Sequence, residues 1–236
     1  MIVATRRRNL LALLMILLAF WAWRSGRIAV DIPDQWNPWS PLDVRAPLDR
    51  WTRMKLMRID HDDVACKTAL ATAMMRYQDI PDRATGDGCG FDNAIRISET
   101  TAKVASAFAL SCRSAVALAM WETHGLQPSA ERWFGSRVAR IEHFGSYSCR
   151  NIYGRDSGPR SRHATADAFD VAGFMLANGK RVRVLGDWKG GSREAQFLHD
   201  IHQSACRYFG SVLGPDYNAA HRDHFHLDRG GYRVCR

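Results

Sequence analysis

The chain has 236 residues, and its 33 Lys and Arg against 24 Asp and Glu give a formal net charge of +9. A basic surface suits anionic partners such as nucleic acid, anionic lipid or an acidic cell-wall polymer. The sequence has no run of five or more basic residues and no nucleic-acid-binding motif. We therefore expect no nucleic-acid partner.

The N-terminal segment predicts export. A basic stretch, Arg6-Arg7-Arg8, precedes an uncharged stretch from Asn9 to Trp23. A basic flank before about 15 apolar residues describes a secretory signal, whereas a full membrane span usually needs about 20. No Ala-x-Ala cleavage site follows, and Trp21-Ala22-Trp23-Arg24 is typical of an interfacial aromatic and basic anchor.

We assign residues 1–28 to an uncleaved signal anchor, with a cleaved signal peptide and a buried helix as alternatives. Export places the rest of the chain on the periplasmic side of the inner membrane, tethered by a single pass or free after cleavage. Residues 29–60 contain Pro33, Pro38, Pro41 and Pro47. Such spacing of prolines predicts an extended linker between the membrane and a domain at residues 61–236.

All six cysteines lie beyond the hydrophobic segment, and their even number predicts three disulfides in an oxidising compartment. No Cys-x-x-Cys pair occurs, so a cysteine zinc site is not expected. Fifteen pairings are possible in principle. Neighbour pairing is the interpretation that we prefer, and it joins Cys66 to Cys89, Cys112 to Cys149, and Cys206 to Cys235.

The first half of the domain predicts helices. One begins at Asp62 or Asp63 and runs through Met74 toward Pro81, followed by a glycine-rich turn at residues 86–90. A second helix is predicted over residues 111–122, because its apolar side chains share one face, and Gly125 suits its end. A short third helix is predicted from residue 128 or 129 to residue 133.

The second half predicts strands at residues 138–142, 168–174 and 181–185. Asn178-Gly179 is a tight-turn signal that joins the last two as a hairpin. A long helix is predicted over residues 192–212. The final strand places His224, His226 and Asp228 on one face. Helices followed by an antiparallel sheet predict an α+β domain.

His163, Asp170 and His226 form a candidate zinc site. Zinc catalysis needs a few protein ligands and one position open to water, whose pKa the ion lowers. Asp170 lies in an otherwise apolar strand, and a buried lone carboxylate is unfavourable unless it is paired or bound to a metal. The alternatives are a hydrogen-bonded structural cluster and an adventitious metal-binding surface.

Three neighbouring residues are candidate catalytic groups. His224 shares the face of His226 and can donate to a substrate carbonyl. His221 and Asp223 compete as the general base, and we prefer His221 because it lies in the incoming loop. The isolated histidines are expected to be surface or packing residues: His61, His124, His143, His199 and His202.

These residues carry a resemblance to known families. His163 and Asp170 followed by His221-x-x-His224-x-His226 resemble the LAS-type zinc peptidases, which include D-Ala-D-Ala peptidases, hedgehog-like domains and, most similar here, penicillin-insensitive murein endopeptidase. Residues 63–236 resemble the bacterial extensin-like C-terminal family. The matching segments are Tyr147-Ser148-Cys149-Arg150, Ser161-Arg162-His163, Ala168-Phe169-Asp170 and Gly214-Pro215-Asp216-Tyr217-Asn218.

The resemblance implies a LAS/hedgehog-like fold, with helices packed on a small antiparallel sheet stapled by disulfides. It implies Zn²⁺ ligation by His163, Asp170 and His226, with catalytic assistance from His221 and His224. Arg150 matches an element that helps to hold the substrate in related carboxypeptidases, although an ordinary surface salt bridge is an equal alternative. Arg162 stands where many relatives carry Glu, which changes the charge beside the first ligand.

The expected function is an exported zinc-dependent peptidase that acts on stem peptides or cross-links of peptidoglycan. Endopeptidase activity is preferred over carboxypeptidase activity because of the histidine order. The alternative is a non-catalytic wall-binding or scaffolding protein that retains the metal-site fold, and a phosphodiesterase or nuclease comes third. The sequence does not indicate which oligomeric state the protein adopts.

Overall fold

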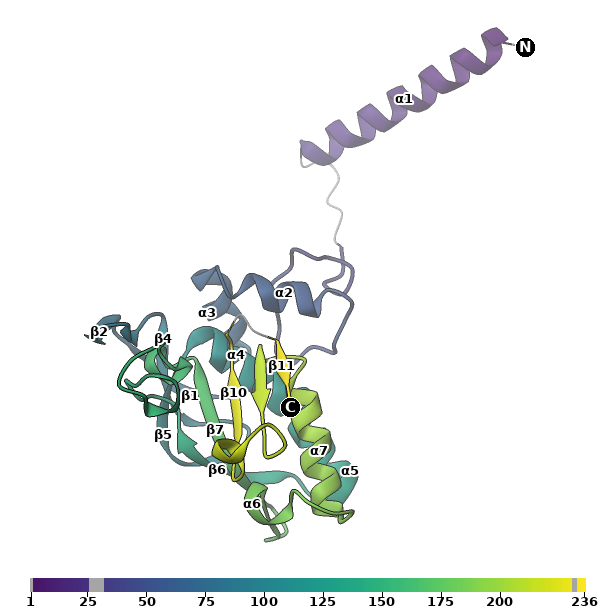
Figure 1. Cartoon of the computed structure of the whole chain (residues 1–236). Coiled ribbons are helices and arrows are strands. Elements are labelled where there is room, and N and C mark those ends of the chain that lie inside the picture. The colour runs from purple at the N-terminus through teal and green to yellow at the C-terminus, as the bar shows by residue number, and fades with distance from the viewer. Residues whose placement is uncertain (1, 26–31, 231–232) are drawn as a thin grey trace. The chain divides into compact units, whose positions relative to one another are not determined.

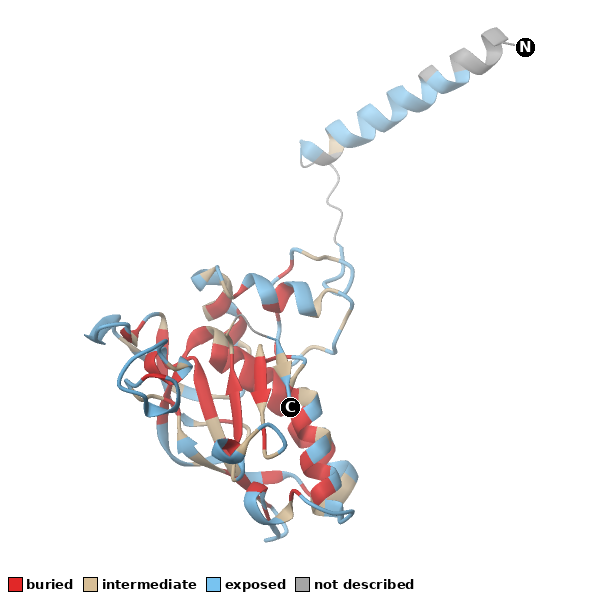
Figure 2. Cartoon of the chain, in the orientation of Figure 1, coloured by how far each residue is buried: buried red, intermediate tan, exposed pale blue. Residues whose placement is uncertain are grey.

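The computed structural model describes residues 2–25, 32–230 and 233–236 (Figure 1). The chain divides into two compact units, residues 1–38 and 39–236, which are described separately. The first contains helix α1 (Ile2–Arg24), which is exposed along most of its described length (Figure 2). In the part of the chain that the structure describes, no helix combines the length and hydropathy needed to cross a membrane. The predicted export signal stays a prediction, and its boundary at residues 28–29 lies outside the described residues.

The second unit is built on a mixed β-sheet. Among the described residues it has nine strands, in the order β1-β4-β5-β6-β7-β10-β9-β11, with β8 paired to β7. The strands are β1 (Arg76–Ile80), β4 (Ala94–Glu99), β5 (Lys103–Ser111), β6 (Val138–Gly145), β7 (Ala168–Leu176), β8 (Arg181–Arg183), β9 (Ser211–Leu213), β10 (Phe225–Asp228) and β11 (Val234–Cys235). A separate hairpin joins β2 (Arg83–Gly86) to β3 (Cys89–Phe91).

The α+β class is confirmed, but the expected small antiparallel sheet is wrong. The pairs β5–β6 and β9–β11 are parallel. The helix predicted toward Pro81 ends at Ala71, and β1 follows it because residues 76–80 pair with β4. Such pairing between distant segments outweighs weak local helical periodicity.

The helices of the second unit are α2 (Thr52–Arg58), α3 (Asp63–Ala71), α4 (Cys112–Trp121), α5 (Gln127–Phe134), α6 (Val184–Asp187) and α7 (Arg193–Ala205). The predicted helices at 111–122 and 128–133 are confirmed, but Gly125 does not end the first one. A π-helical turn η1 (Glu122–Leu126) runs through it into α5. A Cβ on Gly125 would lie 2.5 Å from Ser204 Oγ, so this glycine allows α7 to approach closely.

The core lies between one face of the sheet and the helices α4 and α7. Phe174 on β7 packs edge-on against Phe197 on α7 and against Trp121 on α4. Figure 2 shows this buried layer along the central strands. Helix α7 ends at Ala205 and not near residue 212, because β9 then pairs with β10.

The opposite face of the sheet, called here the outer face, carries Asp170 and Met175 on β7. A register shift between β6 and β7 near Glu142 and His143 resets the alternation of side chains. Val171 before the shift and Phe174 after it therefore both point into the core. The predicted hairpin from β7 to β8 is confirmed.

Residues 39–60, which the sequence assigns to the linker, belong to the second compact unit. They include α2, and the core cluster contains Leu42, Val44, Leu56 and Ile59. Burial of these apolar side chains, two of them between Pro41 and Pro47, fixes the segment on the domain. The linker residues 29–31 lie outside the described residues.

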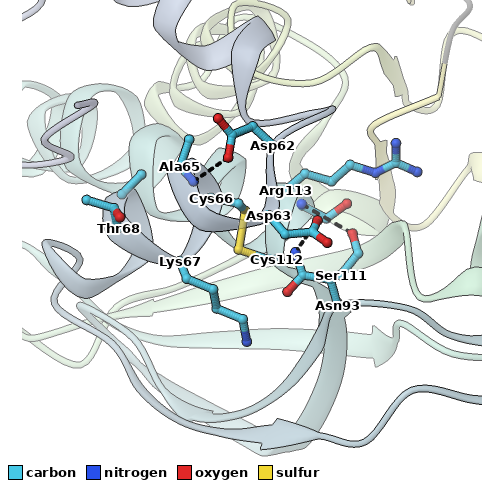
Figure 3. Close-up of a disulfide and its surroundings, with 12 residues drawn as sticks. Asp62, Asp63, Ala65, Cys66, Lys67, Thr68, Asn93, Ser111, Cys112 and Arg113 are labelled. Carbon is cyan, nitrogen blue, oxygen red and sulfur yellow. Dashed lines mark hydrogen bonds between the residues drawn. A yellow bond between two sulfur atoms is a disulfide. The ribbon is translucent and has the colours of Figure 1, made fainter. Parts of the chain in front are cut away.

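Three disulfides join Cys66 to Cys112, Cys89 to Cys149, and Cys206 to Cys235. Only the third predicted pair is confirmed, and the other two predicted pairs are wrong. Helix α3 packs against α4, which brings Cys66 to Cys112 (Figure 3). Contacts between elements decide these pairings, and sequence proximity does not.

Candidate metal centre

The three predicted ligands come from three elements that meet on the outer face of the sheet. Asp170 on β7 and His226 on β10 are direct cross-strand partners, so their side chains share one face. His163 lies in the 3-10 turn η3 (Arg162–Thr165). Ser161 caps this turn by accepting from the His163 backbone N–H, and Ala166 ends it in the left-handed conformation, at φ 55°.

The ligand atoms of the three residues converge. His226 Nδ1 lies 2.9 Å from Asp170 Oδ1 and 3.1 Å from His163 Nε2. His163 Nε2 lies 3.1 Å from Asp170 Oδ2. All three side chains offer one ligand atom within 4.8 Å of the others, as a shared ion requires. The structure therefore brings together the residues that the sequence singled out.

His163, Asp170 and His226 are called the triad below. Hydrogen bonds to residues outside the triad fix which nitrogen of each histidine faces inward. His163 Nδ1 donates to the Ser146 carbonyl at 3.0 Å, and His226 Nε2 donates to Asp228 Oδ2 at 3.1 Å. Both acceptors lack a proton, so the inward nitrogens of neutral rings carry lone pairs. Metal-ligating histidines typically make such outer bonds to carbonyls or carboxylates. Two imidazole nitrogens and a carboxylate oxygen fit the donor set that zinc prefers.

The charges of the triad are strongly coupled. Burial lowers the pKa of His226, but hydrogen bonds to Asp170 and Asp228 outweigh it and raise the pKa to about 9. Burial raises the pKa of Asp170, yet hydrogen bonds from His163 and His226 hold it well below its usual range. The site thus attracts positive charge, as a cation site must.

His221 is held beside the triad as a neutral base. It ends the 3-10 turn η4 (Ala219–His221), and its ring centroid lies 5.7 Å from that of His226. Its Nδ1 donates to Asn218 Oδ1 at 2.8 Å, and this oxygen also accepts from the Ala220 backbone N–H. Burial, together with the nearby His226 and His224, lowers the pKa of His221 to about 4. The ring is therefore neutral at pH 7, with an unprotonated Nε2.

His224 lies just before β10, and so the final strand begins one residue later than predicted. Its Nε2 lies 3.6 Å from Asp170 Oδ1 and its Nδ1 lies 3.0 Å from Asp223 Oδ1. The exposed Phe144 ring packs edge-on against it, 5.6 Å between centroids. Asp223 is thus the hydrogen-bonding partner of His224, whereas the ring of His221 lies beside that of His226.

Arg150 is exposed, in the loop after Cys149. Its backbone carbonyl accepts from the Ser161 N–H at 3.0 Å. Within the described residues its guanidinium has neither a hydrogen-bonding partner nor an ion pair, so the structure shows no polar contact between it and the triad. The role of Arg150 stays a prediction.

Of the isolated histidines, His124, His143 and His199 each bond to a backbone carbonyl. His202 contacts the rings of Trp188 and Phe225. It also lies near the sulfur atoms of Cys206 and Cys235, which are joined as a disulfide. These histidines are packing residues, as expected.

Asp228 and Asn218 received no role from the sequence. Asp228 follows His226 by two residues on the same strand face, and this spacing is a signal for an orienting carboxylate. No local pattern indicates the Asn218 bond to His221. The structure also places Arg162. A Cβ built on Gly230 would lie 2.7 Å from Asp228 Oδ1 and 2.8 Å from Arg162 Nε. The arginine therefore lies beside the carboxylate that holds His226.

Comparison with known proteins gives one match. Residues 64–236 match the model of a family described as extensin-like protein C-terminus. No curated protein and no solved structure matches the chain. The matched residues include every member of the triad together with His221, His224 and Asp228.

Proposed function

The chain belongs to the extensin-like protein C-terminus family, and we propose that it is an exported zinc-dependent peptidase acting on peptidoglycan. The observation that carries the proposal is the convergence of His163 Nε2, His226 Nδ1 and the Asp170 carboxylate within 4.8 Å. The substrate is a peptide bond in a stem peptide or cross-link. The resemblance of the histidine order to LAS-type peptidases favours endopeptidase cleavage and a fold of that type.

In this proposal His163, Asp170 and His226 hold the zinc ion. When bound, zinc polarises a substrate carbonyl and makes a water molecule a stronger nucleophile at neutral pH. Asp228 and the Ser146 carbonyl accept from the outer nitrogen of each ring, so the inner nitrogen presents a lone pair once the ring is neutral. Because the pKa of His226 is raised to about 9, its inner proton has to leave when the ion binds.

The residues around the triad handle protons and charge. His221 Nε2 takes the proton of the attacking water, and Asn218 keeps Nδ1 protonated during this step. His224 in its protonated form donates from Nε2 to the oxyanion that develops on the substrate, while Asp223 orients its ring. The unpartnered guanidinium of Arg150 is a candidate for binding a substrate carboxylate.

Export is supported by the three disulfides, since such bonds persist in oxidising compartments. In the proposal the N-terminal segment holds the protein at the periplasmic side of the inner membrane. A domain attached there lies next to peptidoglycan, which bears many free carboxylates. The net charge of +9 favours the encounter of the two.

The test is incubation of the full-length chain with purified sacculi, with and without a chelator. We expect new muropeptides that disappear with the chelator, return on addition of Zn²⁺, and are absent with His163→Ala. His61→Ala is the matched control, because His61 is an exposed histidine outside the centre, and it should behave like the wild type. Retention on sacculi without any new product would contradict hydrolysis and favour a binding or scaffolding role.

A further inference from the structure

The outer face of the sheet carries a row of side chains on four adjacent strands, and three of the four side chains are basic. Lys103 on β5 pairs with Arg140 on β6, and Arg140 pairs with Met175 on β7. Met175 in turn pairs with Arg181 on β8. Because cross-strand partners point to the same face, these side chains form one row across the sheet. Lys103, Arg140 and Arg181 are all exposed.

Two further charged residues, Arg183 and Glu142, lie on the outer face next to this row. Arg183 is exposed and lies opposite Gly173 on β7, two residues along from Arg181. Glu142 lies opposite the same glycine and forms an ion pair with Arg181, at 2.6 Å. Across the described residues, no carboxylate lies within ion-pair distance of Lys103, Arg140 or Arg183. Glu99 on β4 is the cross-strand partner of Lys103, but its ion pair is with Arg76, at 3.6 Å. The face therefore keeps a net positive charge from Lys103, Arg140 and Arg183.

The basic row and the metal centre share one face. Asp170 and Met175 are both on β7, five positions apart, which corresponds to roughly 16 Å at about 3.3 Å per residue. Between them, β7 presents only the small residues Ala172 and Gly173 on this face. A chain bound at the metal centre can thus continue along β7 to the row without meeting a large side chain from this strand.

We propose that this basic row binds carboxylates of the peptidoglycan strand whose peptide is presented to the metal centre. This inference rests on the proposed function and names a binding surface for its substrate. Guanidinium groups bind carboxylates through paired hydrogen bonds, which favours arginines at such a surface. Neighbouring strands are about 4.8 Å apart, so the cations of Lys103 and Arg140 come from adjacent strands and that of Arg181 comes from the far side of Met175. This arrangement suits a polymer with repeated carboxylates better than a single small anion.

The test compares two double variants of the full-length chain that remove the same charge. Arg140→Gln with Arg183→Gln removes two arginines from the row. Arg193→Gln with Arg207→Gln removes two exposed arginines at and just after α7, which packs on the core face. Binding to purified sacculi is measured by pelleting with a chelator present. We expect the first variant to bind about tenfold more weakly and to lose most of its salt dependence, while the control binds nearly as the wild type does.

A second arm uses sacculi whose carboxylates have been amidated. The wild type should bind these as weakly as the row variant binds native sacculi. Equal loss in both double variants, or undiminished binding to amidated sacculi, would overturn the proposal. So would row-dependent binding to phosphatidylglycerol vesicles in place of sacculi. Because the chelator prevents hydrolysis, these results are independent of whether the protein cleaves peptidoglycan.

Discussion

Replacing His221 by alanine is expected to lower the rate of muropeptide release by about 10²–10⁴-fold, the range of a general base, with the bound metal retained. His221 is not one of the three ligands, its ring lies beside that of His226, and its Nε2 is the unprotonated nitrogen. The measurement is initial release from sacculi at saturating Zn²⁺, with the metal content of the same sample determined in parallel.

The control is Asn218→Asp, which keeps an acceptor for His221 Nδ1–H and should retain much more activity than His221→Ala. An unchanged rate in His221→Ala would show that another group accepts the proton. Asp223 would then be the first candidate, and Asp223→Asn would have to show the loss instead.

Removing the Cys66–Cys112 disulfide by a double alanine substitution is expected to lower the free energy of unfolding by about 4 kcal/mol. The bond closes a loop with a sequence separation of 46, and the entropy of the unfolded chain rises accordingly when it is lost. It also fixes α3 on α4, where both cysteines are buried (Figure 3). The measurement is urea unfolding followed by circular dichroism.

The serine double variant of Cys206 and Cys235 serves as a comparison, because that bond closes a shorter separation of 29. If the Cys66/Cys112 variant unfolded at the same urea concentration as the wild type, the structural role of the bond would be contradicted. An unchanged midpoint when the wild type is fully reduced would contradict it as well.

Most of the candidate metal centre could be predicted from the sequence. His226 and Asp228 alternate with Phe225 and Leu227, and this period of two assigns their faces before any partner is known. Asp170 was identified because a carboxylate in an apolar strand needs a partner. The pairing of β7 with β10 then places Asp170 opposite His226, as the sequence argument required.

The features that were missed depend on contacts between distant segments. The strands at residues 76–111 lack strong alternation, with β1 largely exposed, and pairing with each other defines them. Two disulfide pairings follow from how α3 packs on α4 and where β3 lies. Leu42 and Val44 are buried despite neighbouring prolines, because the domain offers them an apolar surface. No local pattern carries this information.

The central claim is that His163, Asp170 and His226 bind one metal ion, and metal analysis tests it most directly. The full-length chain is incubated with Zn²⁺, freed of excess ion, and analysed by mass spectrometry of the elements. We expect one zinc per wild-type chain and per His61→Ala chain, and none in Asp170→Ala or His226→Ala. A wild-type chain that retains no more zinc than these two ligand variants would contradict it.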